Sequence, residues 1–109
     1  MDTRIREHAS VLFGALSNPS RLRIVDLLCH HDEEMSVNEI CVALSLGQSA
    51  TSQNLATLTR AGVLVVEQRG ASRLYRIRGP RIQRILVLIE EFCTVHDLPG
   101  LHRELDRAP

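Results

Sequence analysis

The chain has 109 residues, of which 44% are apolar, so it can form one domain with a small hydrophobic core. It contains no run of about 18 apolar residues and no apolar segment at its start, which argues against a membrane-spanning helix and a secretory signal. We therefore expect a cytoplasmic protein with no membrane partner, whose three cysteines are free thiols.

The formal net charge is zero, but the charges are unevenly distributed. Residues 47–84 carry seven arginines and one glutamate, giving +6. Residues 1–46 carry four arginines and seven acidic residues, and residues 85–109 carry two arginines and five acidic residues, giving −3 in each case. A concentrated basic segment is typical of a surface that binds nucleic acid. Because only three residues are aromatic, stacking on single-stranded bases is disfavoured, and double-stranded DNA is the predicted partner.

Two helices are predicted at the start of the chain. Apolar residues recur at helical spacing over residues 3–16. Asn18 is suited to cap a second helix and Pro19 to occupy its first position, which predicts this helix over about residues 20–30. One of its faces is expected to be buried, and it comprises Leu22, Val25, Leu28 and Cys29.

A helix-turn-helix is predicted over about residues 36–61. Ser36 is followed three residues later by Glu39, and this capping box starts a third helix. A short turn ends at Gly47, and the fourth helix follows over residues 48–61.

A β-hairpin is predicted after the helix-turn-helix. Its strands cover residues 63–67 and 72–77 and flank a turn at residues 68–71, which gives a wing over about residues 63–78.

The last long helix is predicted to begin at Pro80 and to end near residue 96, before Pro99-Gly100. Residues 101–109 are expected to form a helical turn or no regular structure. The predicted fold is therefore mainly α with a small β-hairpin, a homodimeric winged helix-turn-helix in a single domain over residues 1–109. The helices over residues 3–16 and 80–96 are its predicted dimerisation helices.

The fourth helix begins with polar side chains and continues with apolar ones, as expected for a helix that inserts its first turns into the DNA major groove. Glutamine and asparagine can pair with adenine edges, and serine and threonine hydroxyls bind bases or phosphates. The predicted contacts from this helix are Gln48, Ser49, Thr51, Ser52, Gln53, Asn54, Thr57 and Arg60. A solvated or helix-packing role is the alternative for the hydroxyl residues. Arg69 and Arg73 flank the hairpin tip and are predicted to reach the minor groove or the DNA backbone.

An apolar stripe on the last helix predicts a dimer. Its members are Ile82, Ile85, Leu86 and Ile89. A monomer would leave this stripe in water, whereas a two-fold dimer buries it and places two recognition helices about one DNA turn apart. The expected operator is an imperfect inverted repeat, and binding to it should weaken steeply with salt.

Three segments of the chain are distinctive in combination: LSNPSRLRIVDLL at residues 16–28, SVNEICVALSLGQSATSQNLATLTRAGVL at residues 36–64, and RGASRLYRI at residues 69–77. In this order they resemble the ArsR/SmtB family of bacterial transcriptional repressors, over roughly residues 8–95. The resemblance implies a homodimer that binds operator DNA with two recognition helices and two wings. It also implies release when a ligand or an oxidant reaches a sensor site.

The resemblance offers three sensor sites, which this sequence matches unequally. The family's Cys-Val-Cys metal motif is replaced by Ser36-Val37-Asn38, which disfavours arsenic, lead or cadmium there. A metal site on the last helix has candidates of the right type in His96, Asp97 and His102, but their spacing does not fit. A subset that senses persulfides or oxidants uses one cysteine in the second helix and one near the end of the last.

Cys29 and Cys93, the latter within EEFC, lie in the two elements that this subset uses, and they are the predicted regulatory thiols. Cys41 is the weaker candidate, because it lies on an apolar helix face where cysteine is usually a small buried residue. The alternatives are a metal- or metalloid-responsive repressor and a regulator without a small ligand.

Other function classes find little support in the sequence. The chain has no glycine-rich phosphate loop, nucleophile elbow or His-Glu-x-x-His motif, so we expect neither an enzyme nor a bound cofactor. A winged helix that binds only proteins is the remaining alternative, and the +6 segment argues against it.

Overall fold

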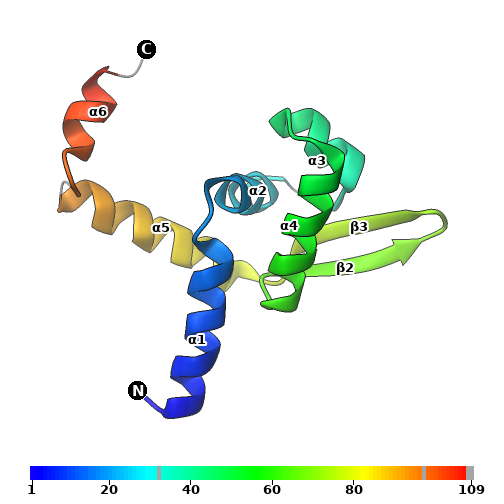
Figure 1. Ribbon diagram of the computed structural model, residues 1–109, viewed down its shortest axis with the longest axis horizontal. Helices are drawn as coiled ribbons and strands as arrows, with labels where there is room; N and C mark the ends of the chain where they lie inside the picture. The colour runs from blue at the N-terminus through cyan, green and yellow to red at the C-terminus, as the bar shows by residue number, and fades with distance from the viewer. Residues whose placement is uncertain (32, 97, 108–109) are drawn as a thin grey trace.

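The computed structural model describes residues 1–31, 33–96 and 98–107, and it confirms a mainly helical fold with a small antiparallel hairpin (Figure 1). The elements in chain order are α1 (Thr3–Leu16), α2 (Pro19–Cys29), β1 (Met35–Ser36), α3 (Val37–Leu44), α4 (Gln48–Arg60), β2 (Leu64–Arg69), β3 (Ser72–Ile77), α5 (Pro80–Val95) and α6 (Leu101–Arg107). Within the described part of the chain, every helix is too short or too polar to cross a lipid bilayer.

The helices begin where local side-chain chemistry predicts. The Asn18 side chain accepts the Arg21 backbone N–H at 3.1 Å, with Pro19 in the first position of α2. At the start of α3, the Ser36 hydroxyl accepts the Glu39 backbone N–H at 3.2 Å, and the Glu39 carboxylate accepts the Ser36 backbone N–H at 2.9 Å. Both bonds of the predicted capping box are therefore formed, and they also lower the pKa of Glu39.

The sheet has three antiparallel strands in the order β1-β3-β2. The hairpin is tighter than predicted, because β2 and β3 pair out to Arg69 and Ser72 and leave only residues 70–71 between the strands. Gly70 adopts a φ of +58° there, a conformation that glycine reaches without strain. The short strand β1 is not predicted from the sequence, since its two residues carry no alternating pattern of their own.

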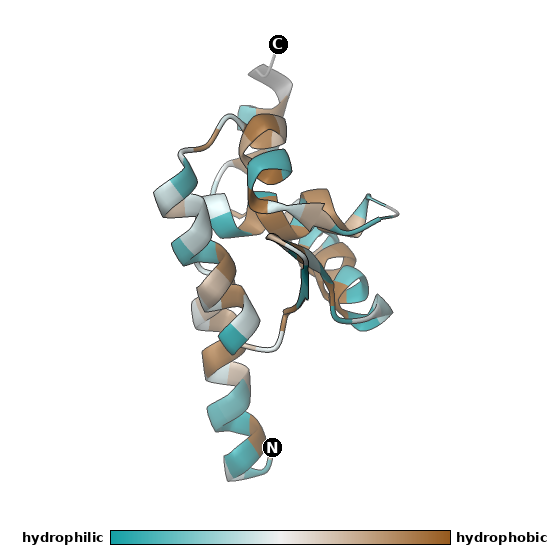
Figure 2. Ribbon diagram, turned by 90° about the vertical axis from the view of Figure 1, so that its right-hand side faces the viewer, coloured by the Kyte–Doolittle hydropathy of each residue, from teal (hydrophilic) through white to brown (hydrophobic). Residues whose placement is uncertain are grey.

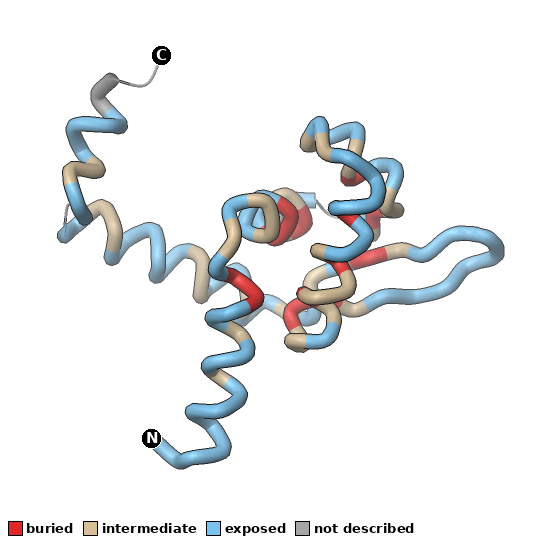
Figure 3. The backbone as a smooth tube through the Cα atoms, viewed as in Figure 1, coloured by how far each residue is buried: buried red, intermediate tan, exposed pale blue. Residues whose placement is uncertain are grey.

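The core lies where α2, α3 and α4 meet the sheet and the end of α1 (Figure 3). The buried apolar residues are Ala15, Leu16, Ile24, Val25, Leu28, Met35, Ile40, Leu55, Leu58, Val63, Leu64 and Tyr75. The predicted buried face of α2 is partly wrong, because Ile24 is buried and Leu22 is exposed beside α5. The buried side of α2 consists of Ile24, Val25 and Leu28, and Leu22 lies outside it.

Helix α1 at the start of the chain, and helices α5 and α6 at its end, extend away from this core (Figure 1). Only Ala15 and Leu16, at the C-terminal end of α1, are buried, and the first turns of that helix are mostly hydrophilic (Figure 2). All described residues of α5 remain at least partly exposed. The tail after Gly100 forms the short helix α6, the more ordered of the two predicted alternatives.

Candidate nucleic-acid interface

A short turn connects α3 to α4 and fixes the angle between these two helices. Ser45 adopts a left-handed conformation, with φ 53° and ψ 47°, and ends α3. The Leu46 backbone N–H then bonds to the Cys41 carbonyl at 3.1 Å, and Gly47 caps α4. Since Leu55 and Leu58 are fully buried, the opposite side of α4 faces outward.

The outward face of α4 carries four of the predicted DNA contacts. Their side chains are exposed, and they are Ser49, Ser52, Gln53 and Arg60. Gly47 supplies no side-chain cap, so the first backbone N–H groups of α4 are available to an acceptor such as a phosphate. This face therefore offers three neutral hydrogen-bonding side chains and the cationic Arg60, with a partial positive charge at the start of the helix.

Thr51 is not part of this face, and its prediction as a DNA contact is wrong. Its side chain is fully buried, with 0% exposure, and its hydroxyl has no hydrogen-bond partner among the described residues. Thr51 lies four residues before Leu55 and seven before Leu58, which places it on the same buried side of the helix.

The remaining polar residues of α4 are engaged within the protein. The Gln48 side-chain amide donates to Oδ1 of Asn38, at the start of α3. The Thr57 hydroxyl donates to the Gln53 carbonyl at 3.1 Å. Asn54 is half-buried and accepts a hydrogen bond from Arg21 on α2 at 3.3 Å. Gln48 and Asn54 thus link α4 to α3 and α2, whereas the Thr57 bond lies within α4 itself.

The two predicted wing arginines differ in their surroundings. The Arg69 guanidinium binds Glu34 at 2.5 Å and Glu67 at 3.1 Å. The hydrogen bond to Glu67 and the charge of Glu34 raise the pKa of Arg69. Arg73 is exposed and lines a hollow of about 470 Å³ between the wing and the starts of α3 and α4. Of the two residues, Arg73 is therefore the one oriented for a ligand next to α4.

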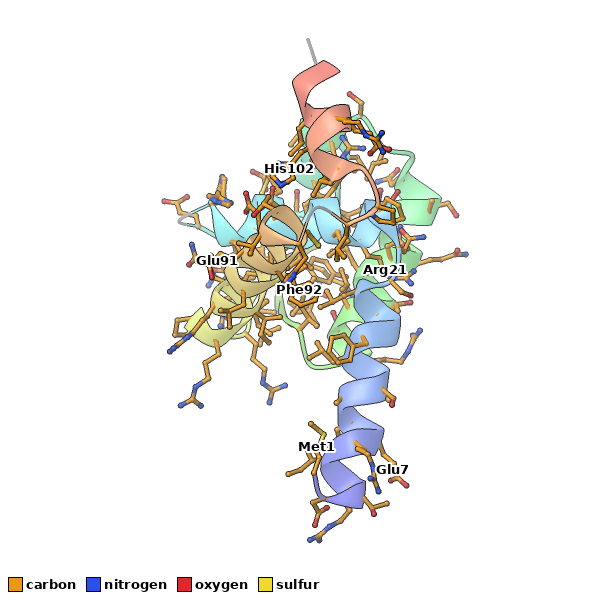
Figure 4. The ribbon with its side chains drawn as sticks, turned by 90° about the vertical axis from the view of Figure 1, so that its left-hand side faces the viewer. Met1, Glu7, Arg21, Glu91, Phe92 and His102 are labelled. Carbon is orange, nitrogen blue, oxygen red and sulfur yellow. The ribbon has the colours of Figure 1, made fainter. Side chains whose placement is uncertain are left out.

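The predicted dimer stripe on α5 is divided by the fold. Ile82 and Leu86 are half-buried and pack against the core of their own chain. Ile89 is exposed and borders a groove shared with α2, and Ile85 is half-buried. The most exposed apolar side chains of α5 are instead Leu88, Phe92 and Val95 (Figure 4 labels Phe92).

The two predicted regulatory thiols lie on helices that pack against each other. Cys29 is the last residue of α2, Cys93 lies in the last turn of α5, and both are half-buried free thiols. The groove between the two helices is lined by Leu22, Asp26, Leu86 and others. Burial, and secondarily the charge of Asp26, raise the pKa of the Cys29 thiol. The His30 ring lies beside Asp26, with Nδ1 2.8 Å from the Asp26 backbone carbonyl oxygen.

The metal candidates at the end of the chain do not come together in the described residues. His96 stacks on Phe92, with ring centroids 4.5 Å apart, and the His102 ring bonds to the Thr94 carbonyl. Asp97 lies outside the described residues. Over residues 1–31, 33–96 and 98–107, no group of three or more His, Cys, Asp or Glu side chains is arranged to hold a metal ion.

Two residues that the sequence did not single out support the interface. Arg21 reaches α4 from α2, and Glu34 holds Arg69 of the wing. The position of Arg21 could have been identified from the sequence. It lies three residues after Asn18, the cap of α2, and therefore close to the end of α1. Glu34 lies within a run of acidic residues and has no signal that distinguishes it from Glu33.

Comparison with known proteins agrees with this architecture. Residues 16–67 match the sequence model of a helix-turn-helix domain. The chain is 35% identical over 89 residues to the transcriptional activator HlyU of Vibrio cholerae, covering 81% of each protein. The structure of reduced HlyU superimposes with a TM-score of 0.68 at 31% identity, over 82% of this chain and 92% of that one.

A further similar structure is that of Mb0332 from Mycobacterium bovis, described as a homodimeric winged helix-turn-helix DNA-binding domain. It superimposes with a TM-score of 0.76 at 27% identity, covering 88% of this chain and 90% of that domain. One assignment follows from the fold, from the arrangement of α3, α4 and the wing, and from the sequence identity to HlyU. The chain belongs to the winged helix-turn-helix family of transcriptional regulators.

Proposed function

We propose that the chain is an ArsR/SmtB-type repressor that binds an inverted-repeat operator as a homodimer. The observation that carries this proposal is the exposed polar face of α4, uncapped at its start and adjacent to the exposed Arg73 of the wing. The homodimeric state and the description of Mb0332 as a possible ArsR-family regulator support it by similarity. A protein-binding winged helix would not require this combination of donors and positive charge.

The test is binding of the full chain to DNA from its own promoter region, followed by fluorescence anisotropy at several salt concentrations. Arg73→Gln is expected to weaken binding several-fold and to reduce the salt slope by about 1.8, since the dimer loses one phosphate contact of about 0.9 from each of its two wings. Arg69→Gln should change the slope less, because Glu34 and Glu67 already neutralise that guanidinium.

Arg103, on α6 and away from the wing, provides a matched control, and Arg103→Gln should leave both affinity and slope unchanged. Equal slopes for wild type and Arg73→Gln would remove Arg73 from the interface. Absence of salt-dependent binding by the wild-type chain, at any site of the promoter region, would refute the proposed function itself.

The proposed signal is a reactive sulfur species that modifies Cys93 and Cys29. The Cys93 thiolate attacks a sulfane sulfur of inorganic polysulfide, forming a cysteine persulfide and a polysulfide one sulfur shorter. The Cys29 thiolate then attacks the Cys93 sulfur, forming a disulfide and releasing hydrosulfide. Such a bond would lock α2 to α5 and change the dimer that binds DNA. The positions of both cysteines on packed helices, and the description of the HlyU structure as reduced, support this signal.

Polysulfide is therefore expected to release the operator from wild-type protein, and not from Cys93→Ser or Cys29→Ser. Because the pKa of Cys29 is raised, its thiolate fraction at neutral pH is below that of an ordinary cysteine, and it increases as pH rises. The rate of release should consequently increase across pH 7–9. Stopped-flow anisotropy with a labelled operator measures this rate.

Cys41→Ser serves as the control and should respond like wild type. Release by zinc or arsenite in place of polysulfide would support the metal-responsive alternative. Unchanged affinity with all three reagents would favour a regulator without a small ligand.

A further inference from the structure

Arg21 joins three helices at one point. It is the third residue of α2, and its planar guanidinium faces acceptors on two other helices. Nε donates to the Ala15 carbonyl at 2.6 Å, and Nη2 donates to the Gly14 carbonyl at 3.3 Å. Nη1 donates to Oδ1 of Asn54 at 3.3 Å. Arg21 lies beside the C-terminal end of α1 (Figure 4), so this one side chain connects α1 to α4.

The contacts with α1 use groups that an α-helix cannot satisfy itself. Gly14 and Ala15 are among the last four residues of α1, whose carbonyls lack α-helical partners. The Gly14 carbonyl also accepts the backbone N–H and the hydroxyl of Ser17, so Arg21 is the additional donor for Gly14 and the side-chain donor for Ala15. These carbonyls form the negative end of the helix dipole, which favours a cation. A guanidinium binds them as a fork with fixed geometry, which a lysine ammonium does not reproduce. Arg21 therefore fixes where α1 ends relative to α2.

The contact with Asn54 determines how that side chain is oriented. Arginine has donors only, so the Asn54 oxygen faces Arg21 and its NH₂ group faces away. Pairing with an adenine edge requires both the oxygen and the NH₂ group of an asparagine. Because its oxygen is engaged and the residue is half-buried at the side of α4, Asn54 is better suited to hold α4 than to read a base.

We infer that Arg21 is a positioning residue for DNA binding, which sets the angle of the recognition helix α4 relative to α1 through Asn54. The inference rests on the proposed function, since it requires α4 to enter DNA. Leu55 and Leu58 hold α4 to the core by apolar contacts, which are not directional. The hydrogen bond from Arg21 is directional. It links the orientation of α4 to α1, whose exposed apolar residues are available to the proposed partner protomer.

A double-mutant cycle on the full chain tests this inference. Operator affinity and its salt slope are measured for wild type, Arg21→Lys, Asn54→Ala and the double variant. Each single change should weaken operator binding by about tenfold, which is the scale of one hydrogen bond to a charged group. The double variant should bind the operator no more weakly than the single variants do. The salt slope should stay that of wild type, because Arg21 contacts no phosphate. Arg23→Lys, on the same helix and bonded only to the Leu44 carbonyl in the described structure, is the matched control.

Two results would overturn the inference while leaving the proposed function intact. One is multiplicative losses in the double variant, about a hundredfold in all, since independent residues add their free energies. The other is a slope reduced by about 1.8 in Arg21→Gln, which removes the charge and would identify a phosphate contact in each of the two protomers. By contrast, a wild-type chain that binds no promoter DNA refutes the proposed function first.

Asn54→Ala alone provides a second test if Arg21→Lys does not fold. The variant is measured on operators in which each A·T pair is replaced in turn. A positioning residue predicts reduced discrimination at every position of the half-site. Loss of discrimination at one base pair only would identify Asn54 as a base reader and overturn the inference.

Discussion

Phe92→Glu is expected to convert the proposed dimer to a monomer and to weaken operator binding by at least about a hundredfold, because burying an unpaired charge costs several kcal/mol. Leu88 and Phe92 are 54% and 56% exposed on one face of α5, with Val95 three residues further along. Separating the protomers also removes the advantage of two linked recognition helices, since each must then bind its half-site alone. Sedimentation equilibrium measures the mass, and anisotropy measures the affinity.

Val87→Glu is a closely matched control for Phe92→Glu. Val87 is also an exposed apolar residue of α5, but it lies on the side that carries Gln83 and Glu91. This variant should remain dimeric and bind the operator as wild type does. A Phe92→Glu protein that sediments as a dimer would show that the protomers associate through another surface.

Leu55→Ala is expected to lower the free energy of unfolding by about 2–5 kcal/mol, the range for a leucine removed from a well-packed core. Leu55 is 0% exposed and belongs to α4, so its loss leaves a cavity directly beneath the recognition helix. Urea denaturation followed by circular dichroism measures the change, at one fixed protein concentration because association shifts apparent stability.

Val42→Ala tests whether the effect of Leu55→Ala comes from burial. Val42 is a largely exposed apolar residue of α3, and its truncation should change the free energy of unfolding by no more than about 0.5 kcal/mol. If Leu55→Ala and Val42→Ala gave similar values, the core described for α4 would be incorrect.

Much of the fold could be predicted because its start signals are local. Asn18, Pro19, Ser36 and Glu39 specify the starts of α2 and α3 through bonds within four residues, and each of these bonds is formed. The burial of Thr51 could also have been predicted, since its spacing to Leu55 places both on one side of α4. Residue type alone does not reveal this burial, because Thr51 is polar like its exposed neighbours.

The contacts that orient the interface could not be predicted in the same way. Arg21 and Asn54 are 33 residues apart, and Glu34 lies in the loop before β1 whereas Arg69 ends β2. Which of several arginines meets which acceptor depends on how the elements pack, and nothing in the local sequence distinguishes Arg69 from Arg73. For the same reason, the sequence reveals the apolar stripe of α5, but it does not show which residues of the stripe pack against the core and which stay exposed.

The exposure of α5 along its whole length has a consequence for gene control. If the protein binds DNA only as a dimer, and that dimer dissociates at low concentration, operator occupancy rises with the square of the protomer concentration. A modest change in synthesis or degradation then produces a larger change in operator occupancy. A cell could therefore tune the response threshold through the amount of regulator alone, before any chemical signal reaches it.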